Sequence, residues 1–328
     1  MSGQSAKYFV GVDIGNTKTV YALVHEDGTV LQKFRGPGAN YQEIGAEEMT
    51  RRVREAMLLI TQAAGISVTD ISAIYYGAAG ADTPADFEIM RPALAEATPG
   101  VAFEFDNDCW IALHSGTKGG PGMVVTCGTG NTNCAMNAVD EKMRIGGLEE
   151  MLGDVLGAFA IARYAVSAAM RSEDGRDEPT ILTSMLPKAM DIASNADFIT
   201  MDINSDRVVT IVQTFFEAAR KGDGKSLEIC WMLVKETLKI VREFYNGLFQ
   251  GESFKLVLEG SVFKQKYEPF TKMLELALHQ KYDVEIVFPE WDPVVGAIFL
   301  AFKSVGVSPE SAIVNRIIKT YTTVEWLV

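Results

Sequence analysis

The chain has 328 residues, of which 48% are hydrophobic and 22% charged, so it is neither a disordered chain nor a collagen or disulfide scaffold. Its length favours two domains, because single hydrophobic cores stop growing well below this size. The 30 Lys and Arg residues against 43 Asp and Glu give a net charge of −13, which argues against nucleic acid or an anionic membrane as a partner.

The N-terminal segment is short and polar and lacks the apolar stretch of a secretory signal, which predicts a cytoplasmic protein. The most apolar long window, 151–170, contains Asp154 and Arg163 and is too polar to span a membrane. The four Cys residues form no Cys-x-x-Cys pair, and there are three His residues. Neither a zinc site nor an iron–sulfur cluster is therefore predicted.

Three strands are predicted at the start of the chain. Residues 8–13 have the pattern of a buried strand, and the turn at 14–18 leads into a second strand at 19–24. A third strand, 29–34, follows a turn that contains Gly28. Short turns between successive strands predict an antiparallel meander.

Helices and strands alternate over the next segment. Helices are expected at 46–64 and 85–97, with strands at 71–76 and 101–105, and a further helix begins at Cys109. Strands separated by helices predict layered α/β structure.

The opening order of strands returns from Gly122. A strand at 122–127, a Gly-rich turn and a strand at 132–139 are followed by a short third strand. The tripeptide Gly-Asn-Thr stands at 15–17 and again at 130–132, at the equivalent turn of each meander. We interpret this repeat as an internal duplication.

The rest of the chain favours helices with two more strands. The polar stretch 171–178 is predicted to be a surface loop, and the apolar spacing over 227–241 predicts one face of a long core helix. The remaining expected elements are strands at 255–258 and 284–288, a helix after each of them, and a C-terminal helix within 308–328.

Two Gly/Thr turns, one in each meander, are candidates for holding a polyphosphate. The first is Asp13-x-Gly15-x-Thr17-x-Thr19, and the second is Gly128-Thr129-Gly130. Glycines allow close approach of the backbone, and N–H groups and threonine hydroxyls donate to phosphate oxygens. Each turn also has a simpler interpretation as an ordinary hairpin turn. In the first turn, Asp13 would then only bond the turn backbone.

Asp108 follows a predicted strand and precedes a predicted helix. One interpretation is an N-cap of that helix. The other is a carboxylate at the carboxyl end of a strand, where α/β proteins place ligands. In that position it would accept the proton of an attacking hydroxyl.

Seven motifs occur in order: DIGNTKT (13–19), GAN (38–40), DND (106–108), CGTG (127–130), GGLEEMLGD (146–154), EGSV (259–262) and PVVGA (293–297). Together they resemble the N-acetylglucosamine kinase and BadF/BadG/BcrA/BcrD ATPase family, within the superfamily of actin, hexokinase and the heat-shock ATPases. The resemblance implies an α/β fold of two ribonuclease-H-like domains with a nucleotide cleft between them. We expect these domains at 1–117, with 305–328 as a candidate addition, and at 118–304.

The resemblance also implies roles for individual residues. The first phosphate loop would consist of Asp13, Gly15, Asn16, Thr17, Lys18 and Thr19, with Asp13 holding Mg²⁺ through water. The second loop would consist of Gly128, Thr129, Gly130 and Asn131, and the adenosine of ATP would lie beside Ala219, Gly260 and Ser261. Asp108 would be the general base, and the other sugar ligands would be Asn40, Gly147, Leu148 and Asp154.

The expected activity is phosphorylation of N-acetylglucosamine at its 6-hydroxyl by ATP. The family usually has Gly-Gly-Trp-Gly in its sugar loop, whereas this chain has Gly146-Gly147-Leu148-Glu149. Glu149 or Glu150 would favour glucosamine if it paired with a free amine, and the simpler interpretation is that both point into solvent.

Three other classes of protein share features with parts of the sequence. The letters DIGNT also resemble type III pantothenate kinases, although those chains are shorter and lack the other motifs. ATPases of the BadF type that drive a partner carry cluster-binding cysteines, whereas the four cysteines here are scattered. A sugar sensor that binds ATP without turnover is the third alternative. A homodimer is expected from the family alone.

Overall fold

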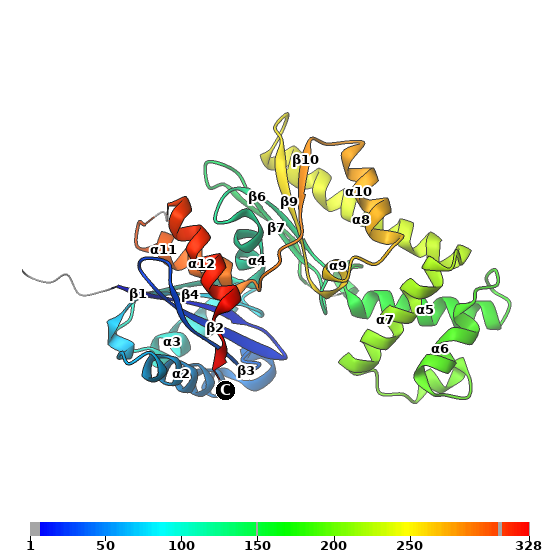
Figure 1. The fold of residues 1–328 in the computed structure, drawn as a ribbon. Coiled ribbons are helices and arrows are strands. Elements are labelled where there is room, and N and C mark those ends of the chain that lie inside the picture. Colours follow the sequence, from blue (N-terminus) through cyan, green and yellow to red (C-terminus); the bar gives the residue numbers. More distant parts are fainter. Residues whose placement is uncertain (1–6, 149, 308–309, 328) are drawn as a thin grey trace, which may run out of the picture. The chain divides into compact units, whose positions relative to one another are not determined.

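The computed structural model describes residues 7–148, 150–307 and 310–327. Contacts divide the chain into two units, and the elements of each are labelled in Figure 1. The first unit consists of Met1–Pro121 with Pro289–Val328, and the second of Gly122–Phe288. Both units are mixed α/β structures, as predicted.

A six-stranded sheet forms the centre of the first unit. Its strands lie in the order β11 (Trp326–Leu327), β3 (Val30–Pro37), β2 (Lys18–His25), β1 (Tyr8–Ile14), β4 (Ile71–Ala78) and β5 (Phe103–Asn107). Strands β1, β2 and β3 pair antiparallel, which confirms the predicted meander, and β4 and β5 run parallel to β1. The carboxyl ends of β1, β4 and β5 therefore meet at one edge of the sheet.

Helices cover both faces of this sheet. Helices α2 (Ala46–Ala63) and α3 (Pro84–Ala97) pack on one face, and α4 (Asp108–Thr117), α11 (Val294–Ser304) and α12 (Ser311–Thr323) pack on the other. The short α1 (Tyr41–Ile44) and η1 (Val68–Asp70) lie in connections. Gly296 brings α11 close to α4, because a Cβ at this position would lie 1.9 Å from the Ile111 carbonyl oxygen.

The C-terminal segment differs from the predicted single helix. Helix α12 ends at Thr323, and β11 then pairs parallel with β3. Helix α11 belongs to the first unit, whereas the sequence division placed residues up to 304 in the second domain. The reason is packing, because α11 shares a core with β1 and β2.

A five-stranded sheet forms the centre of the second unit. Its strands lie in the order β10 (Val284–Val287), β9 (Phe254–Glu259), β6 (Gly122–Thr126), β7 (Thr132–Met136) and β8 (Lys142–Gly146). Strands β6, β7 and β8 form an antiparallel meander, and β9 runs parallel to β6. The orders β3–β2–β1–β4–β5 and β8–β7–β6–β9–β10 are equivalent, which supports the predicted duplication.

Helices of the second unit share one large core with its sheet. They are α5 (Ala158–Glu173), α6 (Leu182–Met190), α7 (Ser205–Arg220), α8 (Gly224–Leu248), α9 (Ser261–Lys264) and α10 (Phe270–His279), with η3 (Asn195–Ile199) packed against them. The short η2 (Glu150–Leu152) lies outside this core. The long core helix is confirmed as α8. The predicted loop at 171–178 is wrong in its first three residues, which complete the last turn of α5.

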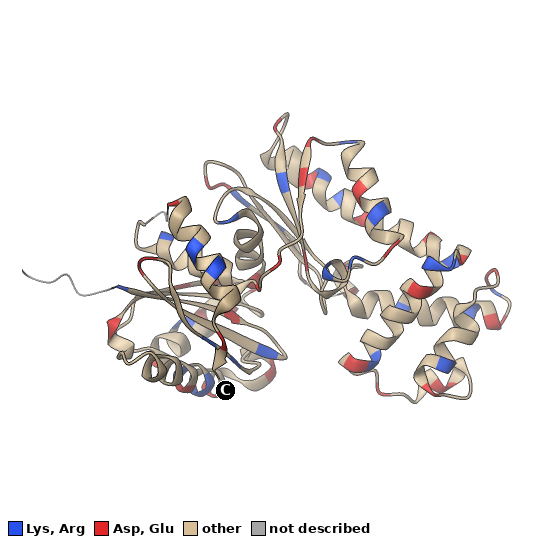
Figure 2. Ribbon diagram, in the orientation of Figure 1, with Lys and Arg blue, Asp and Glu red and all other residues tan. Residues whose placement is uncertain are grey.

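Basic and acidic residues are interspersed along the ribbon of each unit, as the blue and red segments of Figure 2 show. On α2, Arg51 pairs with Glu48 and Glu55 one helical turn away in either direction. Such exposed pairs add little stability and keep the helix surface solvated. None of the helices among the described residues has the length and apolarity needed to cross a membrane.

Candidate functional site

Backbone hydrogen bonds fix the conformation of the loop between β1 and β2. The Gly15 N–H donates to the Lys18 carbonyl at 3.1 Å, and the Gly38 N–H donates to the Thr17 carbonyl at 3.2 Å. A Cβ on Gly38 would lie 1.8 Å from the Asn16 carbonyl oxygen, so only glycine fits there. Within the described part of the chain, the N–H groups of Asn16 and Thr17 make no hydrogen bond. They are available to an anion.

The predicted members of this first loop do not all lie at its surface. Asn16, Thr17 and Lys18 are exposed, and Asp13 is half-buried at the carboxyl end of β1. Thr19 is 0% exposed, and its Oγ1 has no hydrogen-bond partner among the described residues. Thr19 therefore lies beneath the loop, while Asn16 and Thr17 present the loop's donors.

In the second unit, two glycines shape the loop between β6 and β7. A Cβ on Gly260 would lie 2.5 Å from the Cys127 carbonyl, and one on Gly157 would lie 3.0 Å from the Gly130 backbone. These close approaches hold the loop from two sides. The Ala158 N–H also donates to the Gly128 carbonyl at 2.8 Å.

The outer side of this second loop is open. A Cβ added to Gly128 or Gly130 would meet no atom of the described residues within 4 Å, apart from its chain neighbours. The N–H groups of Thr129 and Gly130 donate no hydrogen bond within the described part of the chain. Glycines beside open space with unused amides form a cradle that a phosphate group fits. Asn131 lies behind the loop, where its side chain bonds Asn133 at 3.0 Å.

The three residues predicted beside adenosine differ in exposure. Gly260 precedes α9 with a φ of +104°, and Ser261, the first residue of α9, is exposed. Ala219 is 2% exposed and belongs to the core of the second unit. Its methyl group is thus covered by protein, whereas Ser261 is accessible.

Asp108 lies at the junction of β5 and α4. Asn107 caps α4, because its Oδ1 accepts the Cys109 N–H at 3.0 Å. The interpretation of Asp108 as the N-cap is therefore wrong. Asp108 occupies the first turn and is half-buried. The partial positive charge at a helix N-terminus favours an ionised carboxylate there.

A network that the sequence reading missed supports this strand end. The Asn107 side-chain amide donates to Asp82 Oδ1 at 3.0 Å, and Asp82 follows the neighbouring parallel strand β4. The sequence signal was weak, because Asp82 lies four residues beyond the end of β4. Asp86, four residues later, accepts hydrogen bonds from Tyr41 and Thr83. Burial acts to raise the pKa of Asp86, but these hydrogen bonds outweigh it and lower the pKa to about 2.

Asn40 connects this network to the first loop. Its side-chain amide donates to Asn16 Oδ1 at 2.8 Å, and its Oδ1 accepts the Gln42 N–H at 3.1 Å. The residue is 4% exposed and caps α1. Asn40 thus holds the loop and the start of α1 together in this structure.

The predicted sugar loop folds around Asp154. Its Oδ2 accepts the Leu148 N–H at 2.6 Å, and a Cβ on Gly146 would lie 2.4 Å from its Oδ1. Gly147 has a φ of +81°. Glu149 lies outside the described residues, and Glu150 forms an ion pair with Arg163. The structure therefore brings Gly147, Leu148 and Asp154 together, and it directs Glu150 to an arginine.

The described residues offer little metal-binding or cysteine chemistry. In the described ranges, no group of three or more His, Cys, Asp and Glu side chains could hold a metal ion. One carboxylate such as Asp13 still suits Mg²⁺, which is commonly bound through water together with phosphate oxygens.

All four cysteines are buried, and burial raises the pKa of Cys127 and of Cys230 to about 12. Thiols of this kind are unreactive.

Each unit thus assembles one half of the predicted residues. The first unit gathers the first loop, Asn40 and Asp108. The second unit gathers the second loop, Ser261 and the sugar loop. Each half contains exposed or half-buried polar groups near the ends of its strands, which is where open α/β sheets bind ligands.

A family model described as the BadF/BadG/BcrA/BcrD ATPase family matches residues 10–301. The N-acetyl-D-glucosamine kinase of Dictyostelium discoideum is 25% identical over 321 residues, which cover 92% of this chain and 99% of that protein. The N-acetylmuramic acid/N-acetylglucosamine kinase of Clostridium acetobutylicum is 28% identical over 304 residues, which cover 90% and 98%.

Solved structures show the same fold. A candidate N-acetylglucosamine kinase from Chromobacterium violaceum has a TM-score of 0.70 at 21% identity, with 91% of this chain and 100% of that chain covered. A ROK family glucokinase from Streptomyces griseus, in complex with glucose and AMPPNP, has a TM-score of 0.58 at 16% identity, with 90% and 99% covered. The predicted two-domain α/β fold is confirmed.

Proposed function

This chain belongs to the BadF/BadG/BcrA/BcrD ATPase family, and we propose that it is an ATP-dependent kinase of an amino sugar. N-Acetylglucosamine, phosphorylated at its 6-hydroxyl, is the first candidate substrate. The names of the two curated relatives support this choice. Asp108 carries the proposal, because the structure gives the capping role to Asn107 and leaves Asp108 as a half-buried carboxylate at a strand end.

The two loops would hold the phosphates. Unused N–H groups at Asn16 and Thr17 in one unit, and at Thr129 and Gly130 in the other, supply donors for phosphate oxygens. Asp13 would hold Mg²⁺ through water. The nucleotide supplies the phosphoryl group, and Mg²⁺ neutralises charge on it.

The acceptor side would depend on Asp108. Its carboxylate would accept the proton of the sugar hydroxyl as that oxygen attacks, and a positioned base of this kind typically contributes 10²- to 10⁴-fold in rate. Asn107 and Asp82 would position it by fixing the start of α4. The remaining sugar contacts would come from Asn40, Gly147, Leu148 and Asp154.

The pairing of Glu150 with Arg163 bears on the choice of sugar. A carboxylate already paired with an arginine is a poor partner for a free sugar amine. The glucosamine alternative therefore loses one of its two proposed selectors, and we favour the acetylated sugar. A homodimer and a cytoplasmic location stay predictions.

Product analysis tests the proposed function. The purified protein is incubated with Mg·ATP and separately with N-acetylglucosamine, glucosamine, N-acetylmuramic acid or glucose, and ADP and phosphorylated sugar are both quantified. We expect sugar-dependent ADP release, with N-acetylglucosamine giving the highest kcat/KM and a 6-phosphate by NMR. ADP release that is independent of every sugar would instead indicate an ATPase that acts on a partner.

A further inference from the structure

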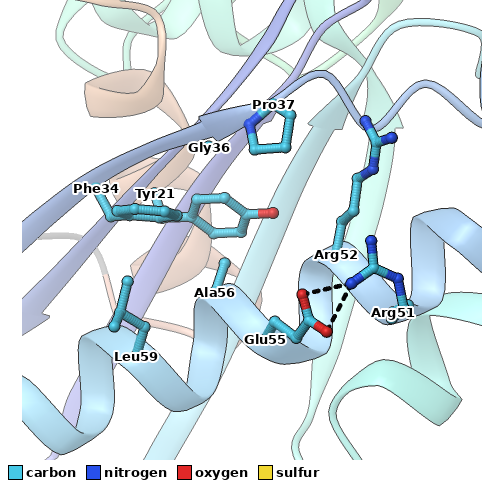
Figure 3. Close-up of a pocket in the computed structure, with 9 residues that line it drawn as sticks. All are labelled: Tyr21, Phe34, Gly36, Pro37, Arg51, Arg52, Glu55, Ala56 and Leu59. Carbon is cyan, nitrogen blue, oxygen red and sulfur yellow. Dashed lines mark hydrogen bonds and ion pairs between the residues drawn. The ribbon is translucent and has the colours of Figure 1, made fainter. Parts of the chain in front are cut away.

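The first unit contains a pocket that the proposed kinase reaction does not use. It lies between α2 and the strands β2 and β3, has a volume of about 290 Å³ and is shown in Figure 3. It is lined by Tyr21, Phe34, Gly36, Pro37, Arg51, Arg52, Glu55, Ala56 and Leu59. None of these residues belongs to the predicted nucleotide or sugar site.

The pocket contains a tyrosine hydroxyl that has no hydrogen-bond partner among the described residues. Tyr21 is 1% exposed, and its OH group forms no hydrogen bond with any described residue. The ring projects into the pocket toward the side on which Arg52 lies (Figure 3). The hydroxyl faces the open pocket, so its hydrogen is available to an acceptor that enters there. Burial raises the pKa of Tyr21, so the hydroxyl keeps its proton and can donate.

Arg52 has guanidinium N–H groups that are not used in hydrogen bonds to the described residues. Arg51 bonds Glu48 and Glu55 through all three of its guanidinium nitrogens. Arg52 donates Nε to Glu48 and Nη1 to the Gly38 carbonyl, and its other guanidinium hydrogens have no partner among the described residues. A phenol and a guanidinium, both donors, suit an anionic acceptor, and a carboxylate matches the guanidinium best.

The rest of the lining is apolar except for Arg51 and Glu55, whose charges pair with each other. Phe34, Pro37, Ala56 and Leu59 form its walls, and its volume is at the lower limit of small-molecule sites. We propose that this pocket is an effector site for a small monocarboxylate, with the carboxylate bound by Tyr21 and Arg52. A flat ring or short aliphatic chain occupies the space between Phe34 and Leu59.

Arg52 also connects the pocket to the first loop. The carbonyl that it bonds belongs to Gly38, whose N–H donates to the Thr17 carbonyl. A ligand that hydrogen-bonds the Arg52 guanidinium would therefore affect the bond from Arg52 to Gly38, and with it the segment that supports the first loop. Binding itself does not depend on the proposed kinase function, because no nucleotide or sugar takes part in it.

Benzoate is the probe, and benzamide is its neutral counterpart. Both are titrated into the full-length protein by ligand-observed NMR, and amide shifts of the labelled protein are followed at Gly36 and Gly38. We expect a benzoate Kd on the order of 1 mM, as suits a ligand of this size, and at least tenfold weaker binding of benzamide. Tyr21→Phe should weaken benzoate binding about fivefold, the worth of one hydrogen bond.

Two neighbouring leucines provide a matched pair of variants. Leu59 lines the pocket and is 38% exposed, whereas Leu58 is 44% exposed and does not line it. Leu59→Trp should abolish benzoate binding by filling the pocket, and Leu58→Trp should leave it unchanged. Equal binding by the two tryptophan variants, equal binding of benzamide, or no benzoate binding at 20-fold the expected Kd, about 20 mM, would each overturn the proposal.

Discussion

The hydroxyl of Tyr321 donates a hydrogen bond to Asp292 Oδ2 at 2.7 Å. This bond ties the last turn of α12 to the segment that precedes α11. Burial and the neighbouring Asp292 carboxylate raise the pKa of Tyr321, so the hydroxyl stays protonated and acts as the donor. Lys33 secures the same turn, since its Nζ donates to the Tyr321 carbonyl at 2.9 Å. The C-terminal segment is thus part of the first unit's core.

Tyr321→Phe should destabilise the first unit by about 2 kcal/mol, because a buried hydrogen bond to a charged group is lost. The ring remains, so the packing of α12 is kept. Thermal unfolding followed by circular dichroism measures the effect. Thr322→Ala on the same helix is the control, because its exposed hydroxyl bonds only the Lys319 carbonyl within α12. Equal melting temperatures for the two variants would contradict the anchoring role of Tyr321.

Asp108→Asn should lower kcat by 10²- to 10⁴-fold while leaving nucleotide affinity within about twofold, because the amide cannot accept the proton that a general base removes. Sugar-dependent ADP release measures kcat, and titration with an ATP analogue measures affinity. Asp106→Asn is the matched control, since Asp106 lies two residues earlier and its Oδ1 accepts the Asn107 N–H. Near-normal turnover by Asp108→Asn would remove it as the base.

Gly130→Ala separates the fold of the second loop from its proposed use. Among the residues that the structure describes, the added methyl group would meet no atom within 4 Å beyond its chain neighbours, and the residue does not have a positive φ. The melting temperature should therefore change by less than about 2 °C. The methyl group would stand where a phosphate is proposed to lie. We therefore expect nucleotide affinity to fall at least tenfold, as measured by isothermal titration calorimetry.

Gly224→Ala is the control for this change, because Gly224 also has open space at its Cβ position and lies in the first turn of α8. It should bind nucleotide normally and be at least as stable, since alanine is the better helix former. A Gly130→Ala protein that binds nucleotide as tightly as Gly224→Ala would show that the second loop does not hold the phosphates.

Local patterns were sufficient to predict both meanders and the position of Asp108. Each meander has short Gly- or Asp-containing turns between apolar strands, so the signal lies within a few residues. Asp108 was identified as a candidate site residue because it directly follows a predicted strand. Asp82 lies four residues beyond the end of β4, so the same rule does not find it.

Features that depend on distant residues were not predictable in this way. The pairing of β11 with β3 joins residues nearly 300 positions apart, and a two-residue strand has no periodicity of its own. An alanine such as Ala219 is common on both the buried and the exposed faces of helices, so its sequence position does not predict its exposure. Only the folded core shows that its methyl group is covered. The family resemblance placed Thr19 in the first phosphate loop, whereas in the structure it is a buried residue of β2.

Asp86 should make the first unit sensitive to acid. Its pKa in the folded protein is about 2, below the ordinary value of 3.8. A carboxylate with a depressed pKa contributes stability that is fully present above its unfolded pKa and is lost as the pH falls through the folded one. The shift corresponds to about 2 kcal/mol. Asp86→Asn should therefore be less stable than the parent protein by about this amount at pH 7, and the difference should shrink between pH 4 and pH 2.

Urea unfolding at pH 7, 4 and 2.5 measures this difference, with Glu88→Gln as the control because Glu88 is exposed on the same helix α3. The control should follow the parent protein at each pH. Since Asp86 accepts hydrogen bonds from Tyr41, Gln42 and Thr83, its loss should also loosen the connection between α1 and α3. A stability difference for Asp86→Asn that stays constant from pH 7 to pH 2.5 would mean that the network does not depend on the charge of the carboxylate.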